Sequence, residues 1–319
     1  MARILAPGED PNDPDEKGQT ALVAATLHGD RDLVEALLQA KASVDLPNAN
    51  GVTAPMVAAH LGKLGILSLL IDASCNLEAE NAAGATALVA AAEGGQLESA
   101  RRLLEAKADV NHVGAMGSTP LFAAVQDGHH EVLRCLLDAG ADADHVLVNG
   151  ASSLMLAAQL GDMESVLALL QAGAEVDKRD RDGSTSLILA SQEGHQALVP
   201  LLLDAGASVD LARQGSSALM VAAQAGHGTT VAALLAAGAA VNQAREDGGT
   251  ALMLAVQEGH RGIVKQLLAA GAHVQQPAAN GATAISLAAR TQDEEMLRCL
   301  LQASKAVSPE DLDQLFGGG

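Results

Sequence analysis

The stretch GSTPLFAAVQDGHHEVLRCLLDAGAD, residues 117–142, contains two apolar helical patterns separated by a glycine turn. The first predicted helix opens at Thr119 and Pro120. The second, residues 131–139, places its Val and Leu side chains on one face at helical spacing and closes on Gly140. A pair of short helices cannot bury its apolar face alone, so this stretch predicts a helical hairpin that needs neighbours on both sides.

The same pattern recurs along the whole chain. Each copy begins with Thr or Ser followed by small and apolar residues, as in TALVAA at 20–25. The copies begin at Thr20, Thr53, Thr86, Thr119, Ser152, Thr185, Ser217, Thr250 and Thr283. Successive starts are 33 residues apart, except for the interval of 32 between Thr185 and Ser217. A fixed period predicts one elongated domain of stacked units, although 319 residues alone would suggest two globular domains.

The repeated unit resembles the ankyrin repeat, whose pattern is D-x-x-G-x-T-P-L-H-x-A-A-x-x-G-H followed by an apolar helix ending in L-L-x-x-G-A-D-V-N. The Gly-His pair stands at 128–129, 194–195, 226–227 and 259–260. The resemblance implies an all-α solenoid of stacked helix-turn-helix units, with projecting β-turn or hairpin fingers and a concave face that binds partners. It also implies that the histidines of these pairs form hydrogen bonds between repeats.

The resemblance extends from residue 18 to residue 308 and predicts nine repeats, starting near 18, 51, 84, 117, 150, 183, 215, 248 and 281. Residues 1–17 fit the closing segment of a further repeat, so we expect either a half-repeat cap or a fragment of a longer protein. The segment SPEDLDQLF, which begins at Ser308, has a capping Ser followed by Pro and acidic residues. We therefore expect a C-terminal capping helix and a glycine tail over 309–319.

The chain is strongly acidic, with 39 Asp and Glu against 19 Lys and Arg and a formal charge of −20. This charge disfavours nucleic acid and anionic membranes, and it favours a basic or apolar peptide segment as partner. The alternative is that the charge serves only to keep an Ala-rich array soluble. We expect no membrane insertion, because the longest uncharged run, 214–244, is interrupted by Gly and His.

Three cysteines lie too far apart to suggest a disulfide framework or a zinc site. Cys135 and Cys299 are expected to be buried apolar residues, and a reducing, intracellular and cytoplasmic environment is expected. The sequence contains no His-Glu-x-x-His, Gly-x-Ser-x-Gly or Cys-x-x-Cys motif. We therefore expect a non-enzymatic protein without cofactors or metal ions.

Two ladders run through the repeats. Gln126, Gln159, Gln192, Gln224 and Gln257 recur near the end of each first helix. Their amides could read an extended peptide backbone or satisfy loop carbonyls of the neighbouring repeat. The position of the family's T-P-L-H histidine carries Val23, Met56, Val89, Phe122, Met155, Ile188, Met220, Met253 and Ser286. These side chains are interpreted as core filler, and the alternative is an adaptable apolar groove.

The finger tips differ most between repeats and are the expected contact residues. Val146, Leu147 and Val148 place three apolar residues where the pattern expects a polar tip, with Val113 and Met116 nearby. The expected protein-binding set is Val113, Met116, Val146, Leu147, Val148, Leu160, Arg179 and Arg181. The alternative for the apolar residues is a local minicore, with Leu147 folded against Val113 and Met116.

The sequence therefore favours a protein-protein interaction scaffold that binds through its fingers and concave groove, centred on the fourth to sixth repeats. Two alternatives remain open: the regulatory or targeting region of a larger multidomain enzyme, or a constitutive subunit of a large assembly. The uncharged seventh repeat, with its shortened finger, is interpreted as a packing surface, a local bend or Ala-rich filler.

Overall fold

The computed structural model describes residues 10–16 and 18–304, and in this part the regular secondary structure is almost entirely helical, as predicted. The first helices of the repeats are α1 (Ala21–His28), α3 (Ala54–His60), α5 (Ala87–Glu93), α7 (Pro120–Gln126), α9 (Ser153–Leu160), α11 (Ser186–Glu193), α13 (Ala218–Ala225), α15 (Ala251–Gln257) and α17 (Ala284–Thr291). The second helices are α2 (Arg31–Gln39), α4 (Leu64–Asp72), α6 (Leu97–Glu105), α8 (His130–Asp138), α10 (Met163–Gln171), α12 (Leu198–Asp204), α14 (Gly228–Ala236), α16 (Arg261–Ala269) and α18 (Glu294–Ser304).

Three short elements lie in the fingers: the 3-10 helix η1 (Ala115–Gly117) and the strands β1 (Ala212–Arg213) and β2 (Ser216–Ser217). The capping helix expected over 309–319 lies outside the described residues, as does most of the partial repeat expected over 1–17.

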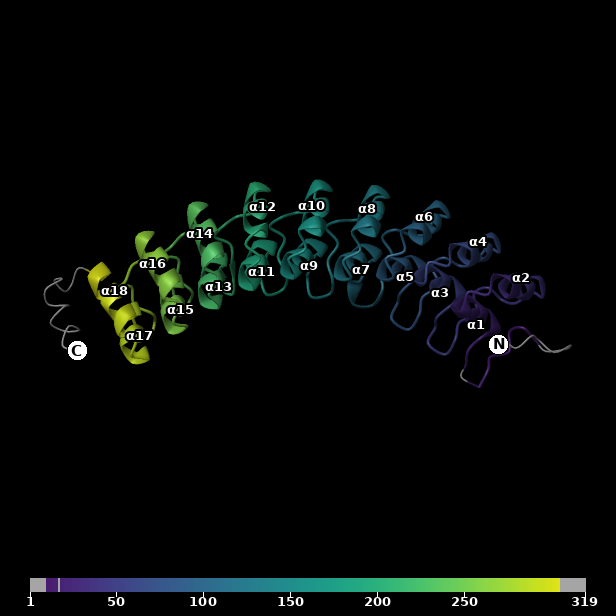
Figure 1. The fold of residues 1–319 in the computed structure, drawn as a ribbon, viewed down its shortest axis with the longest axis horizontal. Helices are drawn as coiled ribbons and strands as arrows, with labels where there is room; N and C mark the ends of the chain where they lie inside the picture. Colours follow the sequence, from purple (N-terminus) through teal and green to yellow (C-terminus); the bar gives the residue numbers. More distant parts are fainter. Residues whose placement is uncertain (1–9, 17, 305–319) are drawn as a thin grey trace. The chain divides into compact units, whose positions relative to one another are not determined.

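The chain forms two compact units, the first comprising described residues up to 153 together with 167–174, and the second comprising 154–166 and 175–304. In the first unit, α1, α3, α5 and α7 pack successively against one another, and each packs against the helix that follows it (Figure 1). In the second unit, α11, α13, α15 and α17 form an equivalent row, backed by α12, α14, α16 and α18 (Figure 1). Within each of these two rows, a repeat is thus one hairpin that completes its core with neighbouring hairpins.

The Thr that opens each copy of the pattern ends up as the N-cap of the first helix. Thr119 has extended backbone angles, and its hydroxyl accepts a hydrogen bond from the Phe122 N–H at 3.2 Å. Equivalent bonds are made by Thr20, Thr86, Thr185, Thr250 and Thr283. Thr119 is buried, so its hydroxyl needs this partner, and the capping role explains the Thr at the start of these six copies. Ser217 is also an N-cap, but its side chain makes no capping hydrogen bond.

The core combines Ala and Leu from the first helices with Leu from the second helices. Ala91 and Ala124 are fully buried on α5 and α7, where their small side chains let these helices pack closely. Leu103 and Leu133 are fully buried on α6 and α8. The ladder interpreted as core filler is buried at Val23, Met56, Val89, Phe122, Met155, Ile188, Met220 and Met253, whereas Ser286 is exposed.

Histidines join neighbouring repeats, as the family resemblance implies. His129 Nε2 lies 3.0 Å from the Glu93 carbonyl oxygen of the preceding repeat. The same bond links His195 to Gln159, His227 to Gln192 and His260 to Gln224. Each ring packs on a glycine of the preceding repeat, because an added Cβ would lie 2.5–2.7 Å from a ring atom at Gly95, Gly161, Gly194 and Gly226.

A second set of hydrogen bonds joins the loops that follow the second helices. In these loops a carboxylate or amide oxygen accepts a hydrogen bond from the backbone N–H of a residue 30 or 31 positions later. In the first unit the pairs are Asn12–Ser43, Asp45–Asn76, Glu78–Asp109 and Asn111–Asp142. In the second unit they are Asp177–Ser208, Asp210–Ala240 and Asn242–His273. The polar residues after each closing turn are therefore structural ties between repeats.

The shortened finger before the seventh repeat is a tight β-hairpin. Arg213 pairs with Ser216, so Gln214 and Gly215 form a two-residue turn. Both have positive φ, 47° at Gln214 and 81° at Gly215, which are the signs required by a type I′ turn. The missing residue that makes the interval 32 is thus accommodated by a closer turn.

We expect Gln214→Asn to stabilise the protein by about 0.5–1 kcal/mol, because Asn tolerates the left-handed region that Gln adopts at a cost. Urea denaturation of the full chain measures the change. Gln224→Asn is the matched control, since Gln224 lies in the right-handed helix α13, where Asn is slightly unfavourable. Equal effects of the two substitutions would contradict the turn assignment.

The expectation that Cys135 and Cys299 are buried is wrong. Both side chains are half-buried, because they lie at the margin of the apolar face of α8 and α18, whereas Cys75 is buried. Burial, followed by the charge of Asp45, raises the pKa of the Cys75 thiol to about 11. Burial also raises the pKa of Cys135. The thiols of Cys75 and Cys135 are therefore protonated and weakly nucleophilic near neutral pH.

Candidate functional site

The fourth and fifth fingers present apolar side chains to solvent. Met116 is 72% exposed, Val113 51% and Val148 50%, while Val146 and Leu147 are half-buried. We call these five residues the apolar finger cluster. Most of the Met116 side chain and half of Val113 remain uncovered, so a minicore built on Leu147 would bury only part of this surface.

Backbone contacts hold the two fingers of this cluster together. The Val148 N–H donates to the Met116 carbonyl at 2.9 Å. A Cβ added to Gly117 would lie 3.1 Å from the Leu147 Cα, so the glycine permits this close approach. Met116 itself has a φ of 57° within η1, a conformation that turns the chain at the finger tip. The cluster is therefore displayed on a fixed backbone.

Carboxylates border the apolar finger cluster on one side. His112, which precedes Val113, lies 3.7 Å from a Glu78 oxygen and 3.6 Å from a Glu80 oxygen. About half of each carboxylate side chain is exposed. His112 Nε2 also lies 3.0 Å from the Gly84 carbonyl oxygen, which fixes the ring between two fingers. The surface thus combines uncovered apolar groups with adjacent negative charge.

In the second unit, the expected contact residues have different roles. Leu160, at the end of α9, is 52% exposed. Arg181 is exposed at its finger tip. Arg179, by contrast, donates hydrogen bonds to the carbonyl oxygens of Gly183 and of Ala212 in the next finger. Its guanidinium is therefore engaged in joining fingers, and sequence alone did not indicate this tie.

The glutamine ladder is divided between exposed and bonded amides. Gln126, Gln159, Gln224 and Gln257 are exposed, whereas Gln192 is half-buried and accepts a hydrogen bond from Arg213 at 2.9 Å. The bonds to histidines of the following repeat use the backbone carbonyls of Gln159, Gln192 and Gln224. The exposed amides therefore remain accessible to solvent.

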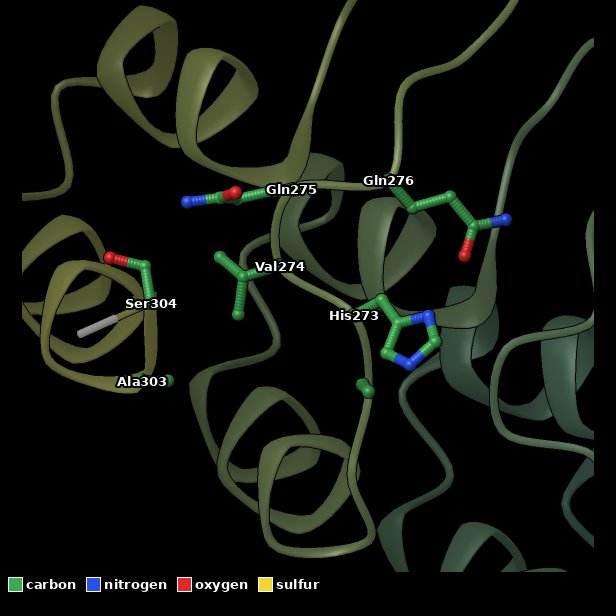
Figure 2. Close-up of a pocket in the computed structure, with 7 residues that line it drawn as sticks. His273, Val274, Gln275, Gln276, Ala303 and Ser304 are labelled. Atoms are coloured by element: carbon green, nitrogen blue, oxygen red, sulfur yellow. The ribbon is translucent and has the colours of Figure 1, made fainter. Parts of the chain in front are cut away.

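A cavity of about 520 Å³ lies beside the loop 272–276 in the second unit. Ala303 and Ser304 of α18 complete its lining. In Figure 2 the side chains of Val274 and Gln275 extend towards Ala303 and Ser304, while those of His273 and Gln276 lie on the other side of the loop. Among the described residues, His273 is the one titratable side chain that lines this cavity.

A smaller cavity of about 220 Å³ lies between the last two fingers and the helices α15 and α17. Met253, Leu254 and Leu287 form its apolar part. The charged side chains of Arg245, Asp247 and Arg290 also line it, together with Gln257, Asn280 and small residues of the fingers. We call this space the α15–α17 cavity. It lies in the eighth and ninth repeats, whereas the sequence favoured the fourth to sixth.

Neither a metal-ion site nor a membrane-spanning helix is found in residues 10–16 and 18–304, which the structure describes. These residues contain no group of three or more His, Cys, Asp or Glu side chains placed to hold a metal ion. Over the same residues, the helices are too short or too polar to cross a lipid bilayer.

Comparison with known proteins gives a family and a structural match. The family described as "Ankyrin repeats (3 copies)" matches residues 1–81, 56–146, 154–245 and 219–313. The crystal structure of the human ASB11 ankyrin repeat domain is similar, with a TM-score of 0.62 and 26% sequence identity. The similarity covers 69% of this chain and 99% of that domain. No curated protein matches the chain.

Proposed function

Because this chain belongs to the ankyrin repeat family, we propose that it is a non-enzymatic scaffold that binds a protein partner through the apolar finger cluster. Ankyrin repeats are generally protein-protein interaction modules. The observation that supports this surface is the exposure of Met116, Val113 and Val148, because contiguous exposed apolar groups on a soluble protein mark interaction sites.

The chemistry around the apolar finger cluster favours one kind of partner segment. Aliphatic side chains of the partner would cover Val113, Met116 and Val148, and a neighbouring Lys or Arg would approach the carboxylates of Glu78 and Glu80. The backbone of the two fingers is already held together, so little conformational entropy is lost on binding. The chain contains only two aromatic residues, Phe122 and Phe316, so the affinity would come from many modest contacts.

A triple variant tests this surface: Val113→Ser, Met116→Ser and Val148→Ser in the full chain. We expect it to weaken partner binding at least about tenfold, which corresponds to about 1.4 kcal/mol, without lowering the melting temperature. A photo-crosslinking residue at position 148 would first identify the partner in the native source. Calorimetric titration of the purified partner would then give the affinity.

The matched control is Leu27→Ser, Leu61→Ser and Leu64→Ser, which removes three exposed leucines of the same unit from its helical region. The control should retain the affinity of the unchanged protein. Equal weakening by both triple variants, or a matching loss of thermal stability in the finger variant, would refute the assignment of the surface.

A further inference from the structure

The α15–α17 cavity carries a charge opposite to that of the whole chain. Its charged lining residues are two arginines and one aspartate, which gives a net charge of +1, whereas the chain carries −20. Its volume of about 220 Å³ is below the range of about 300–1,000 Å³ that holds drug-sized ligands. The cavity therefore suits one or two side chains of a protein better than a small molecule.

One of the two arginines is already paired. Arg245 Nε lies 3.1 Å from Asp247 Oδ1, and its terminal nitrogen lies 2.8 Å from Oδ2, which forms a two-point ion pair. The pair lies across Gly249, where an added Cβ would be 2.9 Å from the Arg245 terminal nitrogen. The backbone of this finger is fixed as well, because the Asp247 carbonyl accepts a hydrogen bond from the Ala279 N–H at 2.8 Å. Asp247 is thus neutralised locally and kept in place.

The second arginine is available. Arg290 lies in the last turn of α17 and is exposed, and within residues 10–16 and 18–304 it forms no ion pair. It occupies the place of the glutamine ladder in the ninth repeat, 33 residues after Gln257. Gln257 lines the same cavity and is also exposed. A guanidinium and an amide therefore stand on adjacent repeats at one rim of the cavity.

The floor between these groups is apolar. Leu254 is 4% exposed, Met253 3% and Leu287 8%. Only small parts of these side chains therefore reach the cavity, and the rest of each side chain is packed in the core. An aliphatic side chain placed there would exclude water from the guanidinium of Arg290. Removal of water strengthens the interaction of an arginine with a carboxylate.

We propose that the α15–α17 cavity binds a partner segment in which an acidic residue adjoins an aliphatic residue. The acidic carboxylate pairs with Arg290 and accepts a hydrogen bond from the Gln257 amide. The aliphatic side chain rests on Leu254 and Leu287. This site lies in the second compact unit and does not depend on the apolar finger cluster of the first unit.

Methyl NMR of the full chain tests the site directly. The chain has eight methionines, and Met253 lines the α15–α17 cavity whereas Met116 belongs to the apolar finger cluster. The probe is the blocked peptide acetyl-Ala-Leu-Glu-Val-Ala-amide. We expect a saturable shift of the Met253 methyl signal and none at Met116. The same peptide with Gln in place of Glu should bind at least about tenfold more weakly, because it lacks the charge-assisted bond.

Arg290→Gln should weaken binding of the Glu peptide about tenfold and remove its advantage over the Gln peptide. Arg181→Gln is the matched control, because it removes the same charge from an exposed arginine of the same unit outside the cavity. The proposal is overturned if the two variants weaken binding equally, if the Glu and Gln peptides bind alike, or if Met253 does not shift. A dimer that dissociates on Arg290→Gln would also overturn it, because the occupant would then be a second copy of the chain.

Discussion

Replacing Leu133 with alanine is expected to lower the free energy of unfolding by about 2–5 kcal/mol. Leu133 is fully buried on α8, which packs against α7 in its own hairpin and against α6 of the preceding repeat. The substitution removes apolar contacts on both sides and leaves a cavity that this Ala-rich array cannot readily refill. The midpoint of urea denaturation of the full chain measures the loss.

Leu27→Ala provides the comparison, because Leu27 is a helical leucine of the same unit that is 50% exposed. A surface substitution of this kind should change stability by less than about 0.5 kcal/mol. Similar effects at Leu27 and Leu133 would mean that the second helices do not form the core in the way the burial pattern indicates.

Gly194→Ala should destabilise the protein by about 2–4 kcal/mol, for two separate reasons. Gly194 has a φ of 75°, a left-handed backbone conformation that is unfavourable for alanine whatever its surroundings. In addition, the new Cβ would lie 2.5 Å from His227 Nδ1, so the ring would have to move away from the Gln192 carbonyl. That carbonyl would then lose its inter-repeat hydrogen bond.

Gly259→Ala separates the two reasons. Gly259 has nearly the same φ, 77°, but nothing lies within 4 Å of a Cβ added there. It should therefore show the backbone cost alone, about 1–2 kcal/mol. The double variant Gly194→Ala with His227→Ala should be less destabilised than the sum of its parts, because one contact is lost in both. An additive result, or equal losses at Gly194 and Gly259, would argue against packing of the ring on the glycine.

The repeat period and the helical hairpins could be predicted because each depends on residues at fixed spacing, whereas the histidine bonds were implied by the resemblance to the ankyrin repeat. Thr119 caps its helix through a residue three positions away, and the ring of His129 reaches a carbonyl of the preceding copy of the same motif. Such interactions recur wherever the same residues recur at the same spacing, so an interaction found in one repeat predicts the equivalent interaction in the others.

The finger contacts could not be predicted in the same way. The sequence placed Arg179 among the expected contact residues for a partner, but its guanidinium donates a hydrogen bond to the carbonyl oxygen of Ala212 in the next finger. The pairing of Arg245 with Asp247 across Gly249 depends on the backbone path of a single loop. The α15–α17 cavity likewise forms from two adjacent fingers and two helices, so no single stretch of sequence reveals it.

The ties between the loops have a consequence for how such a chain can change in length. Each loop oxygen meets the N–H of a residue 30 or 31 positions later, as Asn111 does with Asp142. Deleting a few residues between them would leave a donor and an acceptor without their partners. Recombination that removes one whole period would instead present every oxygen with an equivalent N–H from the next copy. Unequal crossing-over in whole periods is therefore the form of insertion or deletion that this architecture tolerates best.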